Sequence, residues 1–232
     1  MIIKCWSDFT CPFCYIAEHR LAVALENTGL KESTKIVFGA FELNPNAGTV
    51  PKRNIVEGYA RHYGMSIEQA RERVSRIEAM ARGDGLVFNY GTAHATNTFD
   101  ALRIAKLAQS KSNDLGNRFV MRMYEAFFGE NLVMSDHDTL RRISAEMGLD
   151  PSEVDEVLDG NGFAAEVRSD EEDAYAIGVQ AVPFMVINGR YAIPGAIEVS
   201  DFERILRKAF DEEETEVSGG MSCGPDGCGP TE

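Results

Sequence analysis

The residues best suited to chemistry are two cysteines, Cys11 and Cys14, in the segment SDFTCPFCYIAEHRL at positions 7–21. At a helix start, a sulfur at Cys11 would lie near unpaired backbone N–H groups and the positive end of the helix dipole, which favour the thiolate. Cys14 would lie on the same face, within disulfide reach, and could resolve a mixed disulfide formed at Cys11. Pro12 stiffens the turn between them. This spacing predicts a redox-active dithiol.

The segments around this pair are typical of a strand, a helix and a second strand. The run IIKCW at 2–6 predicts a short buried strand. Thr10 is expected to cap the helix that follows, which Cys11 opens with Pro12 in its first turn. The β-rich run TKIVFGAFEL at 34–43 predicts the second strand. Together these elements predict a βαβ unit.

The remainder of the chain predicts helices followed by a hairpin. From residue 46 to 178, apolar residues recur at intervals of three and four, which is the spacing of helix faces. At 182–195 two β-rich runs flank Asn188 and Gly189, a strong signal for a tight hairpin turn. A closing helix is expected from about residue 199.

A βαβ half and a ββα half that are interrupted by helices predict an α/β protein with a thioredoxin-like fold and an inserted all-helical domain. The predicted parts are a discontinuous thioredoxin-like domain over 1–45 and 179–210, a helical insertion domain over 46–178, and a flexible acidic, Gly-rich tail over 211–232 that contains CGPDGC.

Four separated motifs, in the same order, resemble the DsbA family, and more closely its cytoplasmic FrnE-like branch. The motifs are CPFC, FELNP, ATNTFDALRIAKLA and GVQAVPFMVINGRYAIPGA, and the likeness covers about residues 1–210. The resemblance implies a thioredoxin-like fold with a helical insertion. It also implies a thiol–disulfide oxidoreductase or disulfide isomerase that acts on protein or peptide disulfides.

The resemblance assigns roles to individual residues. Cys11 matches the nucleophile of the family, and Cys14 matches its resolving cysteine. Pro183 matches the cis-proline that faces the pair in thioredoxin-like folds, a position that leaves the preceding backbone free to pair with an extended substrate. Val182 is then the expected substrate-contacting residue.

Phe13 departs from the family pattern, because the periplasmic oxidases carry a histidine there that can stabilise the thiolate. Without it, we expect a less oxidising pair, suited to reduction or isomerisation in a reducing compartment. Phe13 and Pro12 are also expected to contribute to substrate binding.

A second cysteine pair, Cys223 and Cys228, is joined by the turn sequence Gly-Pro-Asp-Gly. A turn there would bring the two thiols together. The hypothesis is an auxiliary redox pair that relays electrons to Cys11 and Cys14 or protects them. Metal binding by the tail, and the absence of any role, stay open as alternatives.

Composition limits the partners and the compartment. The net charge of −14 argues against a nucleic acid or an anionic membrane as partner, because either would be repelled. No apolar run approaches the ~20 residues of a membrane span, and no secretory signal is apparent, so a cytoplasmic location is expected. The four histidines show no metal-ligand spacing. No metal and no cofactor are predicted, with glutathione as a candidate co-substrate and a thioredoxin- or glutathione-type protein or thiol as reductant.

Two other functions compete with this interpretation. The 2-hydroxychromene-2-carboxylate isomerases and kappa-class glutathione transferases share the expected fold and use glutathione, but their active position is typically Ser where this chain has Cys11. A non-catalytic zinc-holding interaction protein would instead use both cysteine pairs together as four ligands.

Overall fold

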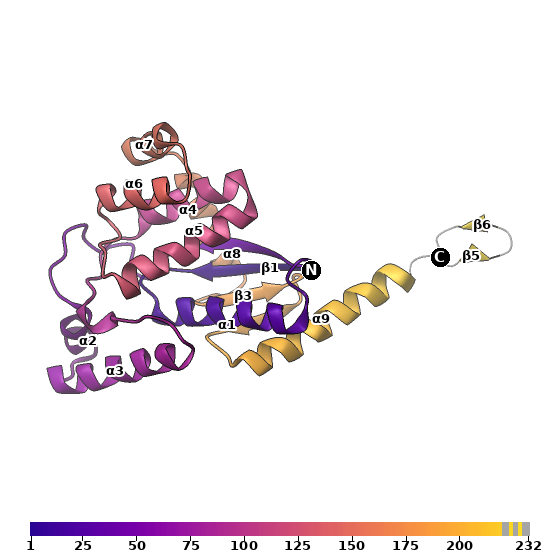
Figure 1. Ribbon diagram of the computed structural model, residues 1–232, viewed down its shortest axis with the longest axis horizontal. Helices are drawn as coiled ribbons and strands as arrows, with labels where there is room; N and C mark the ends of the chain where they lie inside the picture. The colour runs from indigo at the N-terminus through magenta and orange to yellow at the C-terminus, as the bar shows by residue number, and fades with distance from the viewer. Residues whose placement is uncertain (220–222, 225–226, 229–232) are drawn as a thin grey trace.

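The computed structural model describes residues 1–219, 223–224 and 227–228, and a mixed four-stranded sheet lies at its centre (Figure 1). The strands are β1 (Ile2–Ser7), β2 (Lys35–Ala40), β3 (Phe184–Ile187) and β4 (Tyr191–Pro194), in the spatial order β2-β1-β3-β4. β2 is parallel to β1, whereas β3 is antiparallel to both of its neighbours. Because α1 (Pro12–Thr28) joins the two parallel strands, the predicted βαβ unit is confirmed.

The segment between β2 and β3 contains helices and no strand, as expected. Its elements are α2 (Ile55–Tyr63), α3 (Ile67–Gly83), the 3-10 turn η1 (Tyr90–Thr92), α4 (Phe99–Lys111), α5 (Asn113–Tyr124), the π-helical turn η2 (Glu125–Gly129), α6 (His137–Glu146), α7 (Pro151–Asp159) and α8 (Ala164–Ala176). In Figure 1, α4 to α7 lie above the sheet, and α1 and the last long helix, α9 (Val199–Gly219), lie below it.

Side chains alternate between the two faces of β1, as the strand geometry requires. Ile3 and Cys5 face α1 and α9 and pack with Leu21 and Phe202 in one hydrophobic cluster. Trp6 faces the other way, into a second and larger cluster. Cys5 is 1% exposed and therefore packs as a small apolar residue.

The larger cluster continues from the sheet into the helical segment. It joins Trp6 and Phe38 of the sheet to Ile143 of α6 and Val154 of α7. The division into a thioredoxin-like domain and a helical insertion domain stays a prediction, and this shared core indicates that the two parts stabilise each other.

The hairpin between β3 and β4 has the predicted turn. Asn188 and Gly189 have φ values of 50° and 68°, and the N–H of Arg190 donates to the carbonyl of Ile187 over 2.9 Å. Two consecutive residues with positive φ are typical of the type I′ turn, whose twist matches that of the flanking strands.

The closing helix extends further than expected. α9 runs to Gly219, so the predicted start of the tail at residue 211 lies inside a helix. Glu213 accepts a hydrogen bond of 3.0 Å from the side chain of Asn188 and lies 3.3 Å from the N-terminal ammonium of Met1. These two contacts hold the helix against the start of β1.

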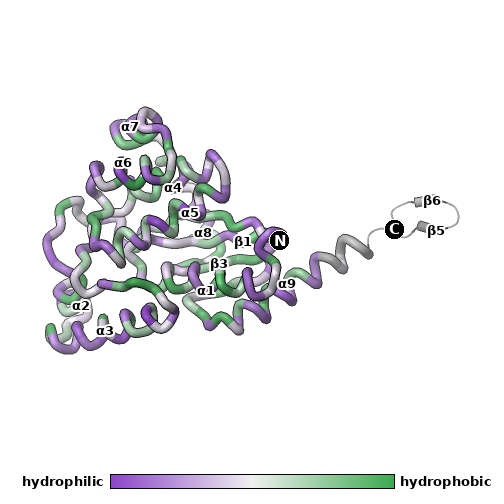
Figure 2. The backbone as a smooth tube through the Cα atoms, viewed as in Figure 1, coloured by the Kyte–Doolittle hydropathy of each residue, from purple (hydrophilic) through white to green (hydrophobic). Residues whose placement is uncertain are grey.

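Hydropathy follows the arrangement of the helices (Figure 2). α3 is predominantly hydrophilic, and its buried residues recur every three or four positions: Ala70, Val74, Ile77 and Ala81. It begins after Ser66, which forms a reciprocal capping box with Gln69. Among the described residues, no helix is both long enough and apolar enough to cross a membrane.

Candidate active site

The CPFC segment lies at the junction of β1 and α1. Cys11 is the N-cap residue of α1, with φ −84° and ψ 113°, and Pro12 occupies the first helical position. The expectation that Thr10 caps the helix is wrong, because its N–H and hydroxyl both donate to Asp8, each over 2.8 Å. Cys11 itself therefore lies at the unpaired N–H groups of the helix start, where an anionic sulfur is stabilised.

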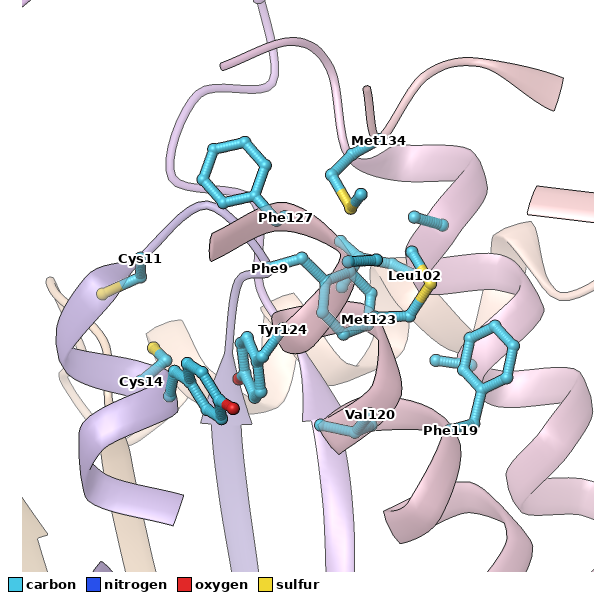
Figure 3. Packing of buried hydrophobic residues seen from close by; sticks show 14 of the residues in the cluster. Phe9, Cys11, Cys14, Leu102, Phe119, Val120, Met123, Tyr124, Phe127 and Met134 are labelled. Atoms are coloured by element: carbon cyan, nitrogen blue, oxygen red, sulfur yellow. The ribbon is translucent and has the colours of Figure 1, made fainter. Parts of the chain in front are cut away.

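The two cysteines differ in access and in chemistry. Cys11 is 4% exposed, whereas Cys14 is fully buried, and both are free thiols. Burial, together with a hydrogen bond between the two thiols, raises the pKa of Cys14 well above its usual range. Figure 3 shows both cysteines at the start of α1. Cys14 is thus the protonated, shielded member, and Cys11 is the sulfur that a substrate can approach.

The loop before β3 reaches the first cysteine. The peptide bond between Val182 and Pro183 is cis, as the resemblance implied. The Cys11 thiol donates a hydrogen bond of 3.4 Å to the carbonyl of Val182, which is 8% exposed. The structure therefore brings together Cys11, Cys14, Val182 and Pro183.

The two residues between the cysteines differ in exposure. Pro12 is buried, whereas Phe13 is 37% exposed. Phe13 thus presents an apolar surface next to Cys11, while Pro12 contributes through the backbone of the first helical turn.

A half-buried carboxyl, that of Glu18, lies one turn beyond Cys14. Glu18 accepts hydrogen bonds of 2.6 Å from the Ser7 hydroxyl and 2.8 Å from the Tyr124 hydroxyl. Burial raises the pKa of Glu18 to about 7, although both hydrogen bonds oppose the rise. Its charge in turn adds to the raised pKa of Cys14. Glu18 also lines a cavity of about 840 Å³ between α1, β2 and α5, which gives its proton a route to solvent.

Lys4 does not lie with these groups. Its ammonium is 3.1 Å from Asp170 and 2.8 Å from Asp173 on α8, and it stacks over the Trp6 ring. Glu18, by contrast, lies within electrostatic reach of Cys14.

Asp8 organises the loop, and the sequence did not single it out. One carboxylate oxygen accepts both donors of Thr10, and the other accepts the N–H of Leu43 at 2.7 Å and the hydroxyl of Thr98 at 3.2 Å. Its carbonyl accepts the N–H of Cys11 over 3.1 Å. Asp8 thereby fixes the approach to α1 against two distant segments.

Aromatic rings from the helical segment support the back of the site. Tyr15, which follows Cys14, stacks on Phe88, Tyr124 and Phe128 with ring centroids 6.0, 5.2 and 5.8 Å apart. Tyr59 of α2 packs edge-on against Tyr90 of η1, with centroids 6.2 Å apart. Burial raises the pKa of both tyrosines, and the charge of Cys11 adds to the rise. Tyr90 belongs to the same hydrophobic cluster as Cys11.

The tail pair is described only in its backbone. β5 (Cys223–Gly224) pairs antiparallel with β6 (Gly227–Cys228), and Cys223 is the register partner of Cys228. The side chains of both cysteines, and the intervening Pro225 and Asp226, lie outside the described residues. Within the described part of the chain, no group of three or more His, Cys, Asp or Glu is arranged to hold a metal.

A strand that leads into a helix-capping CxxC, faced by a cis-proline loop, is the site of a thioredoxin-like protein. The chain belongs to the DsbA-like thioredoxin domain family, whose sequence model matches residues 2–207. The protein has the thioredoxin-like DsbA fold, and the members of this family are oxidoreductases or isomerases.

Two proteins are similar to this chain over most of its length. Protein YwbO of Bacillus subtilis (strain 168) is 25% identical over 205 residues, which cover 88% of this chain and 94% of YwbO. The crystal structure of the probable DsbA oxidoreductase SCO1869 from Streptomyces coelicolor is similar over 100% of both chains, with a TM-score of 0.85 and 29% identity.

Two further structures share the fold at lower identity. The cytosolic disulfide reductase DsbM from Pseudomonas aeruginosa has a TM-score of 0.63 and 19% identity, and the likeness covers 91% of this chain and 100% of DsbM. A 2-hydroxychromene-2-carboxylate isomerase has a TM-score of 0.61 and 16% identity, with 96% and 100% covered.

Proposed function

We propose that this protein is a thiol–disulfide oxidoreductase that reduces or isomerises protein or peptide disulfides through Cys11 and Cys14. The observation that carries the proposal is the placement of Cys11, which occupies the N-cap position of α1 with its sulfur 3.4 Å from the Val182 carbonyl on the cis-proline loop. An extended substrate paired with the backbone of Val182 would bring its disulfide to this sulfur.

The reaction has two exchange steps. The Cys11 thiolate attacks one sulfur of the substrate disulfide, so a Cys11–substrate disulfide forms and the second substrate sulfur leaves as a thiolate. Cys14 then loses its proton and attacks the Cys11 sulfur, which forms the Cys11–Cys14 disulfide and releases the first substrate sulfur. Two electrons pass from the dithiol to the substrate, and a thioredoxin- or glutathione-type reductant restores the dithiol.

Glu18 is suited to the second step. Its pKa of about 7 means that the carboxylate and the carboxylic acid are both populated near neutral pH. Glu18 can therefore take up the proton that Cys14 loses and pass it to solvent through the adjoining cavity.

The direction and the compartment follow from Phe13. With no histidine between the cysteines, the thiolate lacks one stabilising group, which favours a reducing role in the cytoplasm and the FrnE-like branch. The similarity in fold to a cytosolic disulfide reductase supports the same role.

The test is disulfide exchange by the purified protein. Insulin reduction and the recovery of scrambled disulfides should both require Cys11, and a Cys11→Ser variant should show only the background rate of the reductant. Equal rates for the wild type and for the reductant alone would overturn the proposal.

A glutathione-dependent isomerase of the 2-hydroxychromene-2-carboxylate type is the second candidate, because that isomerase has the same fold. Isomerase turnover that survives Cys11→Ser, without disulfide reduction, would favour it. A zinc-holding role for the two cysteine pairs would instead appear as stoichiometric zinc in the purified protein and as unfolding on chelation.

For the tail pair we retain the relay as part of the proposal. The register of β5 and β6 supports a pairing of Cys223 with Cys228, because directly opposed residues in an antiparallel ladder have Cα separations compatible with a disulfide. The pair would pass electrons to Cys11 and Cys14 or shield them from overoxidation.

A further inference from the structure

One positively charged segment of this acidic protein lies between β2 and η1. Residues 46–83, which contain the loop before α2 and both α2 and α3, hold seven Lys and Arg against four Asp and Glu. We call this segment the cationic hairpin. It carries a net charge of +3. Because the whole chain carries −14, the remaining residues together carry −17.

Most of the cations of the hairpin make no ion pair with a described residue. Most Lys and Arg side chains in the described residues make ion pairs, and seven make none: Lys35, Lys52, Arg53, Arg61, Arg71, Arg73 and Arg207. Five of these seven lie in the hairpin, and all five are exposed. Their positive charge is therefore available to a partner and not neutralised within the fold.

The cationic hairpin lies against the active site. The N–H of Ile55, at the start of α2, donates to the carbonyl of Ala93 over 2.9 Å, next to η1. Tyr59 packs on the buried Tyr90, which belongs to the same hydrophobic cluster as Cys11. In Figure 1, α2 lies at the end of the molecule where β1 ends and α1 begins.

The exposed Arg73 and the nucleophile Cys11 both act electrostatically on Tyr59. Arg73 stacks over Tyr63 at 5.0 Å from the ring centroid. Burial raises the pKa of Tyr59, and the nearby Cys11 adds to the rise, whereas Arg73 opposes it.

We infer that the cationic hairpin recruits disulfide substrates that carry carboxylates beside their cysteines, as in acidic peptides or acidic segments of proteins. The inference rests on the proposed disulfide exchange at Cys11. The net negative charge of the rest of the chain repels an acidic substrate, whereas the exposed, unpaired cations of the hairpin attract it towards the end of the molecule that holds Cys11. Such steering acts over about a Debye length and requires no fixed contact.

The test compares peptides that differ only in the charge next to the disulfide. Three peptides would carry the same disulfide loop flanked by Glu, Gln or Lys, and kcat/KM would be measured for each at low and high salt. We expect a preference of about tenfold for the Glu peptide over the Lys peptide at low salt, decreasing towards equality at high salt.

Charge-reversal variants locate the effect. Arg53→Glu with Arg61→Glu should abolish or reverse the preference. Lys35→Glu with Arg207→Glu makes the same change in net charge at exposed, unpaired cations outside the hairpin, and should retain it. If the first variant does not fold, as judged by its thermal unfolding, Lys52→Glu with Arg71→Glu takes its place.

Two outcomes would overturn the inference. One is equal kcat/KM for all three peptides in the wild type, and the other is an equal loss of preference in the control variant. A binding measurement separates the proposed recruitment from the proposed disulfide exchange. It uses fluorescent Glu and Lys peptides and a protein variant in which Cys11 and Cys14 are both replaced by Ser. Preferential binding without turnover would refute the disulfide exchange alone, and turnover without preference would refute the recruitment alone.

Discussion

The thiol of Cys11 donates a hydrogen bond to the backbone carbonyl of Val182, which lies 171 positions away in the sequence. This contact joins the end of the first strand to the loop before the third, so the nucleophile and the proposed docking backbone for the substrate are adjacent. The geometry of exchange therefore depends on the whole sheet and not on the CPFC segment alone.

Replacing Cys11 and replacing Cys14 should stop the exchange reaction at different steps. Cys11→Ser should abolish insulin reduction, because no sulfur remains to form the first mixed disulfide. Cys14→Ser should still attack but should accumulate the mixed disulfide, because the resolving sulfur is missing. Non-reducing electrophoresis after incubation with a disulfide substrate would detect the trapped species. A trapped adduct in Cys11→Ser and none in Cys14→Ser would reverse the assignment.

Glu18 should make the stability depend on pH. Its pKa is about 7 in the folded protein against an ordinary value of 4.5, so the folded state holds this proton more tightly than the unfolded state. The associated stability is fully present below pH 4.5 and is lost as the pH rises to about 7, a loss on the order of 3 kcal/mol. Glu18→Gln should remove this loss.

The measurement is urea unfolding of the wild type and Glu18→Gln at pH 5 and pH 8. The exposed Glu166 of α8 offers a matched control, and Glu166→Gln should retain the wild-type dependence. A wild type that is equally stable at both pH values would contradict the prediction. In exchange assays, Glu18→Gln should slow the resolution step and leave the first attack unchanged.

Phe13 should set the reduction potential of the pair. Phe13→His should stabilise the thiolate form and raise the potential by about 30 mV or more, which corresponds to ~1.4 kcal/mol. Equilibration with glutathione buffers measures both potentials. A wild-type potential near the approximately −120 mV of a strong periplasmic oxidant would contradict the reducing role.

The tail pair should matter in turnover and not in the first chemical step. Replacing Cys223 and Cys228 by Ser should lower steady-state turnover with a thioredoxin- or glutathione-type reductant. The single-turnover attack of reduced Cys11 should be unchanged, because it does not involve the tail. Equal steady-state turnover for this variant and the wild type would remove the relay from the proposal.

The shared core should make the sheet and the helical segment unfold together. Phe128 is fully buried and its ring lies 4.4 Å from that of Phe88, so Phe128→Ala should cost about 3–5 kcal/mol. The exposed Val87 nearby provides a control, and Val87→Ala should change stability by less than about 0.5 kcal/mol. A second unfolding transition in Phe128→Ala would indicate that the helical segment is an independent domain.

The parts of the fold that the sequence predicted correctly depend on local signals. The turn at Asn188 and Gly189 follows from backbone preferences of two residues, and the helix after the first strand follows from the position of Pro12. The spacing of Cys11 and Cys14 likewise placed both thiols at the start of one helix, because three residues span about one helical turn.

The parts that were missed depend on tertiary contacts. The N-cap was assigned to Thr10, but Asp8 binds both donors of Thr10 and leaves Cys11 at the helix start. No sequence pattern shows that Glu18 bonds to Tyr124, which lies 106 positions away, or that Tyr59 packs on Tyr90, which shares a hydrophobic cluster with Cys11. The position of Asp8, an acidic residue in the turn after the first strand, was the only local signal for its role in organising the loop.

The ion pair between Met1 and Glu213 has a consequence for the relay. It fixes the middle of α9 beside the start of β1, and Cys11 lies beyond the other end of that strand, about 20 Å away. With α9 helical to Gly219, only three residues separate the helix from Cys223, and such a link spans at most about 14 Å. Electron transfer from the tail would then be a bimolecular event between two copies, accelerating with protein concentration, unless the last turns of α9 unwind.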